Sequence, residues 1–219
     1  MNILILILLI FLIYFLSLKN IQSLYFLFFK VTKNQQLAYT LISLLFLPGT
    51  IIHEFSHFFA AIFLFLNVRG IQIFPKFENN QIKLGTVLYE KKGPIRGVLV
   101  GIAPLFGAFL LFFSLSYFNI FPCNKLGLNI AIIYLIFSIS STMFSSKQDL
   151  VDLIYIIPFI LILSLTLYIF DIKINVSIKN QLLINYFSLF LEKTNYMLFI
   201  SLLIHLVIYF LTQLFKKSS

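Results

Sequence analysis

The stretch PGTIIHEFSHFFAAIFLFL, residues 48–66, decides what kind of protein this chain forms. It places His53, Glu54 and His57 in a segment built mainly of Ile, Phe, Leu and Ala, and residues 37–66 contain no other acidic or basic side chain. Ionisable groups are costly in hydrocarbon and need a compensating partner. The stretch therefore indicates a functional group buried in an apolar helix.

The composition of the whole chain places this stretch in a membrane protein. Its 219 residues are 61% hydrophobic and 11% charged, with a mean hydropathy of +1.03. Too few polar residues are present to cover a water-soluble domain, so we expect an integral, multi-pass protein of the lipid bilayer. The net charge of +9 comes from scattered Lys and Arg, which favours contact with anionic lipid over nucleic acid. A single cysteine, Cys123, excludes an intrachain disulfide.

Hydropathy predicts an all-α polytopic membrane protein with about six transmembrane helices and a small β-hairpin insertion. About twenty apolar residues cross a bilayer. The expected spans are residues 3–18, 37–66, 97–118, 127–144, 151–170 and 196–215. The second is too long for one straight crossing, and Pro48 and Gly49 interrupt it, which favours a kink or a new helix start. We expect residues 21–36 to lie along the interface.

The one sizeable polar insertion is residues 67–96. Two β-prone runs, 71–74 and 82–89, flank the turn-prone sequence ENNQ, which predicts a hairpin. The hairpin is either an ordinary surface element or an edge strand that pairs with an extended peptide substrate.

We expect a single domain over residues 1–219, because no internal repeat or low-complexity linker divides the chain. Its catalytic core would be residues 37–170, with an extra N-terminal helix at 3–18 and a C-terminal helix at 196–215. With six alternating crossings, nine Lys and Arg lie on the hairpin side and seven on the other. This excess favours a cytoplasmic hairpin, and we expect a bacterial cytoplasmic membrane.

His53, Glu54 and His57 match the pattern H-E-x-x-H. Residues four apart share one face of a helix, so both imidazoles can reach one metal ion. Zinc suits nitrogen ligands, and Glu54 is placed to take a proton from a metal-activated water. The pattern would arise by chance in about one such chain in a thousand. The alternative is a set of polar residues that packs helices together.

A hydrolytic zinc site normally has three protein ligands, so a third must come from elsewhere in the chain. Asp149 and Asp152 stand at the start of the expected fifth span. Asp149 can instead belong to a helix cap, because Ser146 precedes it with capping-box spacing. His205 is an ordinary hydrogen bonder between helices or, alternatively, a reserve ligand or a residue of a substrate channel.

The stretch GVLVGIAPLFGAFLLF, residues 97–112, combines small residues with a proline. Gly101, Ala103, Gly107 and Ala108 allow helices to approach closely. Pro104 breaks the helical ladder, which is tolerated in a membrane only where protein or water satisfies the freed carbonyl. We expect close packing against the histidine-bearing helix or, alternatively, contact with substrate or an oxyanion.

Together, the motif on an apolar helix, the following hairpin, the Gly- and Pro-containing helix and a distant aspartate resemble intramembrane metallopeptidases of the site-2-protease type. The resemblance covers roughly residues 48–153. Within the family, the chain looks like a small, divergent branch that lacks a PDZ domain. The resemblance implies one zinc ion held by His53, His57 and Asp149. It further implies Glu54 as the catalytic base of an endopeptidase that cleaves a membrane protein or peptide substrate in or beside the bilayer.

Two other functions remain open at this point. A catalytically inactive pseudoprotease would bind membrane segments through the same architecture. A metal-handling transporter would use the same histidines, but it should also line several spans with ionisable groups. The expected spans 3–18, 97–118 and 127–144 contain no acid, base or histidine, which counts against a transporter.

Overall fold

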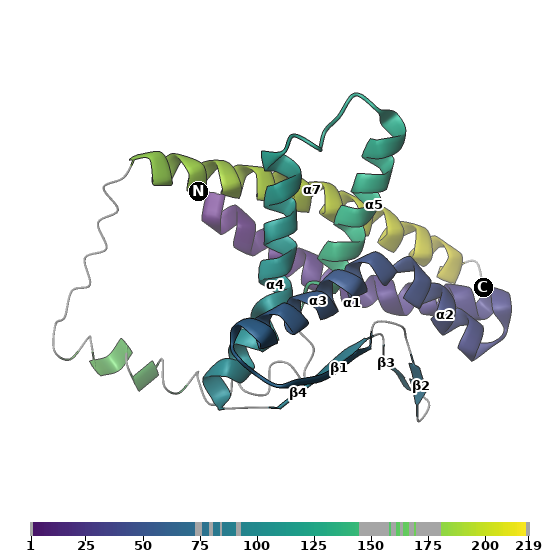
Figure 1. Ribbon diagram of the computed structural model, residues 1–219. Coiled ribbons are helices and arrows are strands. Elements are labelled where there is room, and N and C mark those ends of the chain that lie inside the picture. Colours follow the sequence, from purple (N-terminus) through teal and green to yellow (C-terminus); the bar gives the residue numbers. More distant parts are fainter. Residues whose placement is uncertain are drawn as a thin grey trace.

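The computed structural model describes residues 2–72, 76–78, 81–83, 85–90, 93–144 and 181–217, and a few positions between 158 and 169 (Figure 1). The fold is mostly helical with a small antiparallel β insertion. The described helices are α1 (Asn2–Thr32), α2 (Gln35–Leu45), α3 (Leu47–Phe63), α4 (Pro94–Tyr117), α5 (Leu126–Thr142) and α7 (Gln181–Lys217). The strands are β1 (Val68–Gln72), β2 (Lys76–Glu78), β3 (Gln81–Lys83) and β4 (Thr86–Tyr89).

Three of the described helices are long and apolar enough to cross a bilayer. They are α1, α4 and residues Ile184–Leu214 of α7, and the bent pair α2–α3 would make a fourth crossing. Large apolar side chains are exposed along α1 and α7, as expected where a helix contacts lipid. The described residues therefore support three or four spans of a membrane protein. The expected span 151–170 lies largely outside them.

The outer helices are longer than the sequence predicted. α1 runs to Thr32 through residues expected at the interface, and α7 begins at Gln181 instead of residue 196. The polar residues after position 18 do not end α1, because α7 supplies their partners. The Asn20 amide donates to the His205 carbonyl oxygen at 2.9 Å, and the Lys19 ammonium lies 5.8 Å from the centre of the Tyr209 ring.

α1 and α7 lie side by side and run in the same direction. Near their starts the Asn195 amide donates to the Asn2 carbonyl oxygen at 2.9 Å, and further along Asn20 meets His205. Figure 1 shows α4 and α5 crossing this pair steeply. A topology of six alternating crossings would make the first and last helices antiparallel. The parallel arrangement of α1 and α7 does not fit this expected topology. The cytoplasmic placement of the hairpin, which assumed it, stays a prediction.

The helices pack through a core of fully buried apolar side chains. Ile13 of α1, Phe112 of α4, Ile136 of α5 and Leu198 of α7 meet in one cluster. In a bilayer such packing works mainly through close van der Waals contact, because the lipid is as apolar as the side chains.

α2 and α3 form one apolar segment that bends by 70° at the predicted break. Pro48 stands in the first turn of α3, where its missing N–H costs nothing. α5 partners the backbone groups that the break leaves without a helical partner. The Tyr134 hydroxyl donates to the Leu45 carbonyl oxygen at 2.8 Å, and the Gly49 N–H donates to the Ser138 hydroxyl at 2.9 Å. The predicted new helix start is thus confirmed.

The polar insertion folds as antiparallel pairs, β1 with β4 and β2 with β3. The predicted hairpin is confirmed, but its outer pair begins earlier, at Val68, and includes a bulge between Val68 and Gly70. Figure 1 shows the outer pair alongside α3. Val68 and Tyr89 pack against Ala61 and Val100, which attaches the sheet to α3 and α4.

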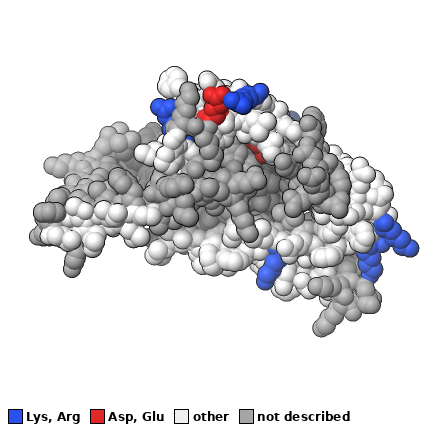
Figure 2. Space-filling view, turned by 90° about the horizontal axis from the view of Figure 1, so that it is seen from below, with Lys and Arg blue, Asp and Glu red and all other residues white. Residues whose placement is uncertain are grey.

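The structure describes few charged side chains, and two of them pair outside the helices. At the base of the hairpin, Arg69 forms a 2.6 Å ion pair with Glu90, and the Asn67 amide also donates to Glu90. Both charged groups are exposed, so the pair contributes at most about 1 kcal/mol. On the face drawn in Figure 2, the described charged side chains form small separate groups.

The Gly49→Ala substitution tests the contact between α3 and α5. A Cβ at Gly49 would overlap the Ser138 carbonyl oxygen and the Thr142 hydroxyl, so the helices would have to separate. We expect a loss of about 1–3 kcal/mol in the free energy of unfolding, measured by denaturant unfolding in detergent micelles. Gly127→Ala is the matched control, because a Cβ there meets nothing within 4 Å. Equal stability of the two variants would contradict the contact.

Candidate functional site

The motif residues lie on α3, between the helix break and the β insertion. His53 and His57 stand one turn apart, with their Nε2 atoms 3.1 Å from each other and their ring centres 4.7 Å apart. His57 and Glu54 are buried, and His53 is partly buried. Helical spacing alone brings the two imidazoles onto one face.

The second nitrogen of His57 is held by a carbonyl of α4. His57 Nδ1 lies 2.8 Å from the carbonyl oxygen of Val100, which is fully buried. In a regular helix that oxygen would accept from the residue four positions later, which here is Pro104 and has no N–H. Pro104 therefore leaves the Val100 oxygen without a donor in its own helix, and His57 Nδ1 donates to this oxygen instead. This answers how Pro104 is tolerated inside an apolar helix.

The second nitrogen of His53 is held by a carbonyl of α5. His53 Nδ1 lies 2.6 Å from the carbonyl oxygen of Thr142, the last residue of that helix. The last four carbonyls of a helix have no partner within it, so this oxygen is also available. Two different helices thus orient the two rings through backbone groups that their own ladders do not use.

These partners decide where the protons of both imidazoles lie. A carbonyl oxygen only accepts, so each Nδ1 carries the proton and donates it. A neutral imidazole then has its lone pair on Nε2, and the two Nε2 atoms face each other at 3.1 Å. Two lone pairs at this distance repel unless a cation lies between them, either a proton or a metal ion. Two nitrogen ligands of a tetrahedral zinc are about 3.4 Å apart, close to the observed spacing.

The carboxylate of Glu54 is covered by the chain just before β4. An ideal Cβ at Gly85 would lie 2.5 Å from Glu54 Cγ and 2.6 Å from Oε1. With the Glu54 side chain in this conformation only glycine fits here, so Gly85 brings the β insertion onto the motif. Sequence reasoning missed Gly85, although an isolated glycine in a strand pattern can mark a close backbone approach.

Small residues also allow α4 to approach α3. A Cβ at Gly107 would overlap the hydroxyl of Ser56, which donates to the Ile52 carbonyl oxygen at 2.7 Å. The predicted close packing of this segment against the motif helix is confirmed. Contact of this segment with substrate or an oxyanion stays a prediction.

The candidate third ligands, Asp149 and Asp152, lie outside the described residues. Among the residues that are described, no three or more His, Cys, Asp or Glu side chains gather to hold a metal ion. His205 is fully buried on α7, where its Nε2 lies 3.1 Å from the Ser141 hydroxyl. This contact favours the helix-packing role of His205 over that of a reserve ligand.

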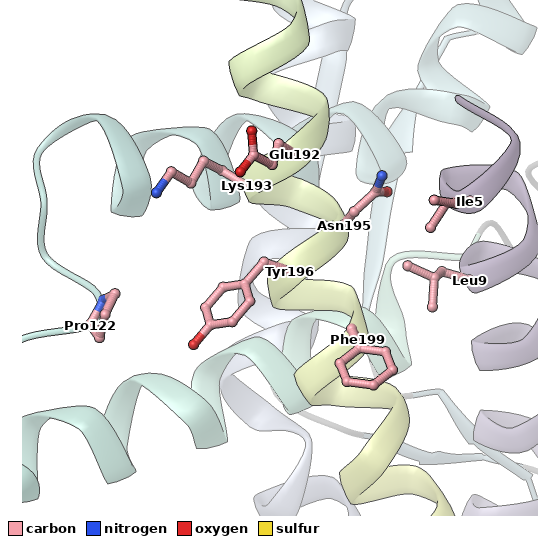
Figure 3. A pocket seen from close by; sticks show the side chains of 8 residues that line it. All are labelled: Ile5, Leu9, Pro122, Glu192, Lys193, Asn195, Tyr196 and Phe199. Atoms are coloured by element: carbon pink, nitrogen blue, oxygen red, sulfur yellow. The ribbon is translucent and has the colours of Figure 1, made fainter. Parts of the chain in front are cut away.

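A cavity of about 490 Å³ lies elsewhere in the fold. It is lined by α1, by the segment before α5 and by α7, and Figure 3 shows Asn195, Ile5 and Leu9 on one side of α7, with Tyr196 and Pro122 on the other. None of its lining residues comes from α3, so the cavity is separate from the two histidines.

No family model, curated protein or solved structure matches this chain. The resemblance to site-2-protease-type enzymes therefore stays an expectation from the motif and its surroundings.

The Pro104→Ala substitution tests how His57 is oriented. Alanine restores an N–H that competes for the Val100 carbonyl oxygen, so the bond from His57 Nδ1 should weaken. We expect a shifted Nδ1 resonance in ¹⁵N spectra of histidine-labelled protein, which are simple because the chain has three histidines. Pro94→Ala is the control, because Pro94 is at the start of α4, where no preceding turn of the helix offers a carbonyl acceptor for its N–H. An unchanged His57 signal in Pro104→Ala would contradict this account.

Proposed function

We propose that this protein is an intramembrane zinc endopeptidase that hydrolyses a peptide bond within or beside the bilayer. The observation that carries the proposal is the pair of Nε2 atoms 3.1 Å apart, each ring held through Nδ1 by a backbone carbonyl. Metal-binding histidines commonly donate their other N–H to a carbonyl, which sets the tautomer and the ring orientation. Two ligand nitrogens and the contacts that orient them therefore support the proposal of a zinc site.

In this proposal His53 and His57 hold the metal, and Asp149 completes the ligand set, with Asp152 as its alternative. Nitrogen and carboxylate ligands together suit zinc, and three protein ligands leave a position open for water. When bound, zinc would lower the pKa of that water and polarise the substrate carbonyl.

Glu54 is the general base of the proposed reaction. It lies beside His53 on α3, and Gly85 of the β insertion covers its carboxylate. Its role is to take a proton from the attacking water and to deliver it to the leaving amine. Burial excludes bulk water from the carboxylate, which strengthens its electrostatic interactions.

The β insertion is the proposed holder of the substrate. Helical substrates hide their peptide bonds, so a membrane segment must become extended before it can be cleaved. β4 begins directly after Gly85, which contacts Glu54. A peptide that adds as a strand beside β4 would therefore bring its backbone close to the base.

Separate substitutions distinguish catalysis from metal binding. Glu54→Gln should keep zinc but lower the cleavage of co-expressed membrane reporters by at least about a hundredfold, because it removes the base. His53→Ala should lose both zinc and cleavage. Glu192→Gln on α7 is the control, since Glu192 lies on another helix. Bound zinc with no cleavage in the unmodified protein would instead identify a pseudoprotease, and unchanged cleavage in Glu54→Gln would exclude Glu54 as the base.

Zinc analysis of two aspartate variants identifies the third ligand. We expect Asp149→Ala to lose stoichiometric zinc and Asp152→Ala to retain it, as measured by elemental analysis of the purified protein. Loss in Asp152→Ala alone would move the assignment to Asp152. Retention in both variants would show that neither carboxylate is the ligand.

A further inference from the structure

The last turns of α5 present polar groups on two faces. One face contacts α2 and α3 through Tyr134, Ser138 and the carbonyl of Thr142. These positions are four residues apart and so lie in one line along the helix. The other face contacts α7 through Ser140 and Ser141. α5 is therefore the element that joins the motif helix to α7.

The contact between α5 and α7 centres on His205. Its Nε2 lies 3.1 Å from the Ser141 hydroxyl, and its Nδ1 lies 2.8 Å from the Ser201 carbonyl oxygen. The hydroxyls of Ser140 and Ser201 meet at 2.5 Å beside it, and the Phe137 ring packs against the imidazole at 4.9 Å between centres. His205, Ser140 and Ser201 are fully buried. Polar groups this deep in an apolar bundle hold helices at one register, because sliding would leave them without partners.

We propose that His205 is a positioning residue for His53, acting through the end of α5. Ser141, which His205 contacts, directly precedes Thr142, whose carbonyl oxygen accepts the proton of His53 Nδ1 at 2.6 Å. A rotation or shift of this last turn would carry the Thr142 oxygen away from the imidazole. His205 thus sets the orientation of His53 without touching it. The effect of His205 on zinc binding rests on the proposed function, in which His53 is a zinc ligand.

The expected effect is smaller than that of a direct partner of a ligand. Loss of a group that hydrogen-bonds a metal ligand typically lowers metal affinity by about 10- to 100-fold. His205 acts one contact further away, so its loss should lie at the lower end, at about tenfold.

The His205→Leu variant of the full chain in detergent tests this role, with Asn20→Leu as the matched control. Asn20 contacts the same turn of α7 but from α1, where its amide donates to the His205 carbonyl oxygen. Both changes remove a buried polar contact, so both should lower the unfolding temperature. Only His205→Leu should weaken zinc binding about tenfold in competition with a chelator, and His205→Gln, which keeps hydrogen-bonding groups, should recover most of that affinity.

A second readout needs no bound metal. The ¹⁵N resonance of His53 Nδ1 in metal-free protein reports its bond to Thr142, and it should shift in His205→Leu but not in Asn20→Leu. If His205→Leu does not fold, Ser141→Ala removes the same contact more mildly and carries both measurements.

The outcomes separate this inference from the proposed function. Equal zinc affinity and unchanged His53 signals in all the variants, or equal losses in His205→Leu and Asn20→Leu, would overturn the positioning role. Zinc that is retained in His53→Ala would overturn the proposed function instead. In that case the metal-free His53 signal still decides whether His205 orients the ring.

Discussion

Two backbone carbonyls that their own helices do not use are the constraint on which the site depends. In hydrocarbon a carbonyl without a donor costs several kcal/mol, and an imidazole without a partner is also unfavourable. Pro104 leaves the Val100 oxygen available, and the end of α5 leaves the Thr142 oxygen available. The N–H groups of His57 and His53 meet these needs, which directs both Nε2 atoms toward one point.

α5 links this site to the rest of the fold. α5 is a short apolar helix of 17 residues. It hydrogen-bonds the backbone at the break between α2 and α3, and it orients His53. It also contacts α7 through buried hydroxyls. Its serine-rich end would be a weak helix in water, because serine hydroxyls compete with the backbone. Among apolar neighbours the same hydroxyls become the groups that hold three helices together.

Local patterns explain which parts of the fold were predictable. The proline after an apolar run marked the start of α3, and the alternation around ENNQ marked the β insertion. The ends of the outer helices were not predictable. Asn20 and Lys19 look like the end of a span, but partners about 185 residues away on α7 keep α1 continuous. A contact over that separation leaves no local signature.

The sequence by itself determined an apolar, mostly helical chain and two histidines on one helical face, because hydropathy and the 3.6-residue period are local properties. Only the tertiary structure decided that Nδ1 of each imidazole faces a backbone carbonyl and that Nε2 faces the other imidazole. It also showed that Pro104 leaves a carbonyl oxygen available to His57, that Gly85 covers Glu54 and that His205 contacts α5. Each of these pairings joins residues that lie far apart in the chain, so it exists only once the helices have packed.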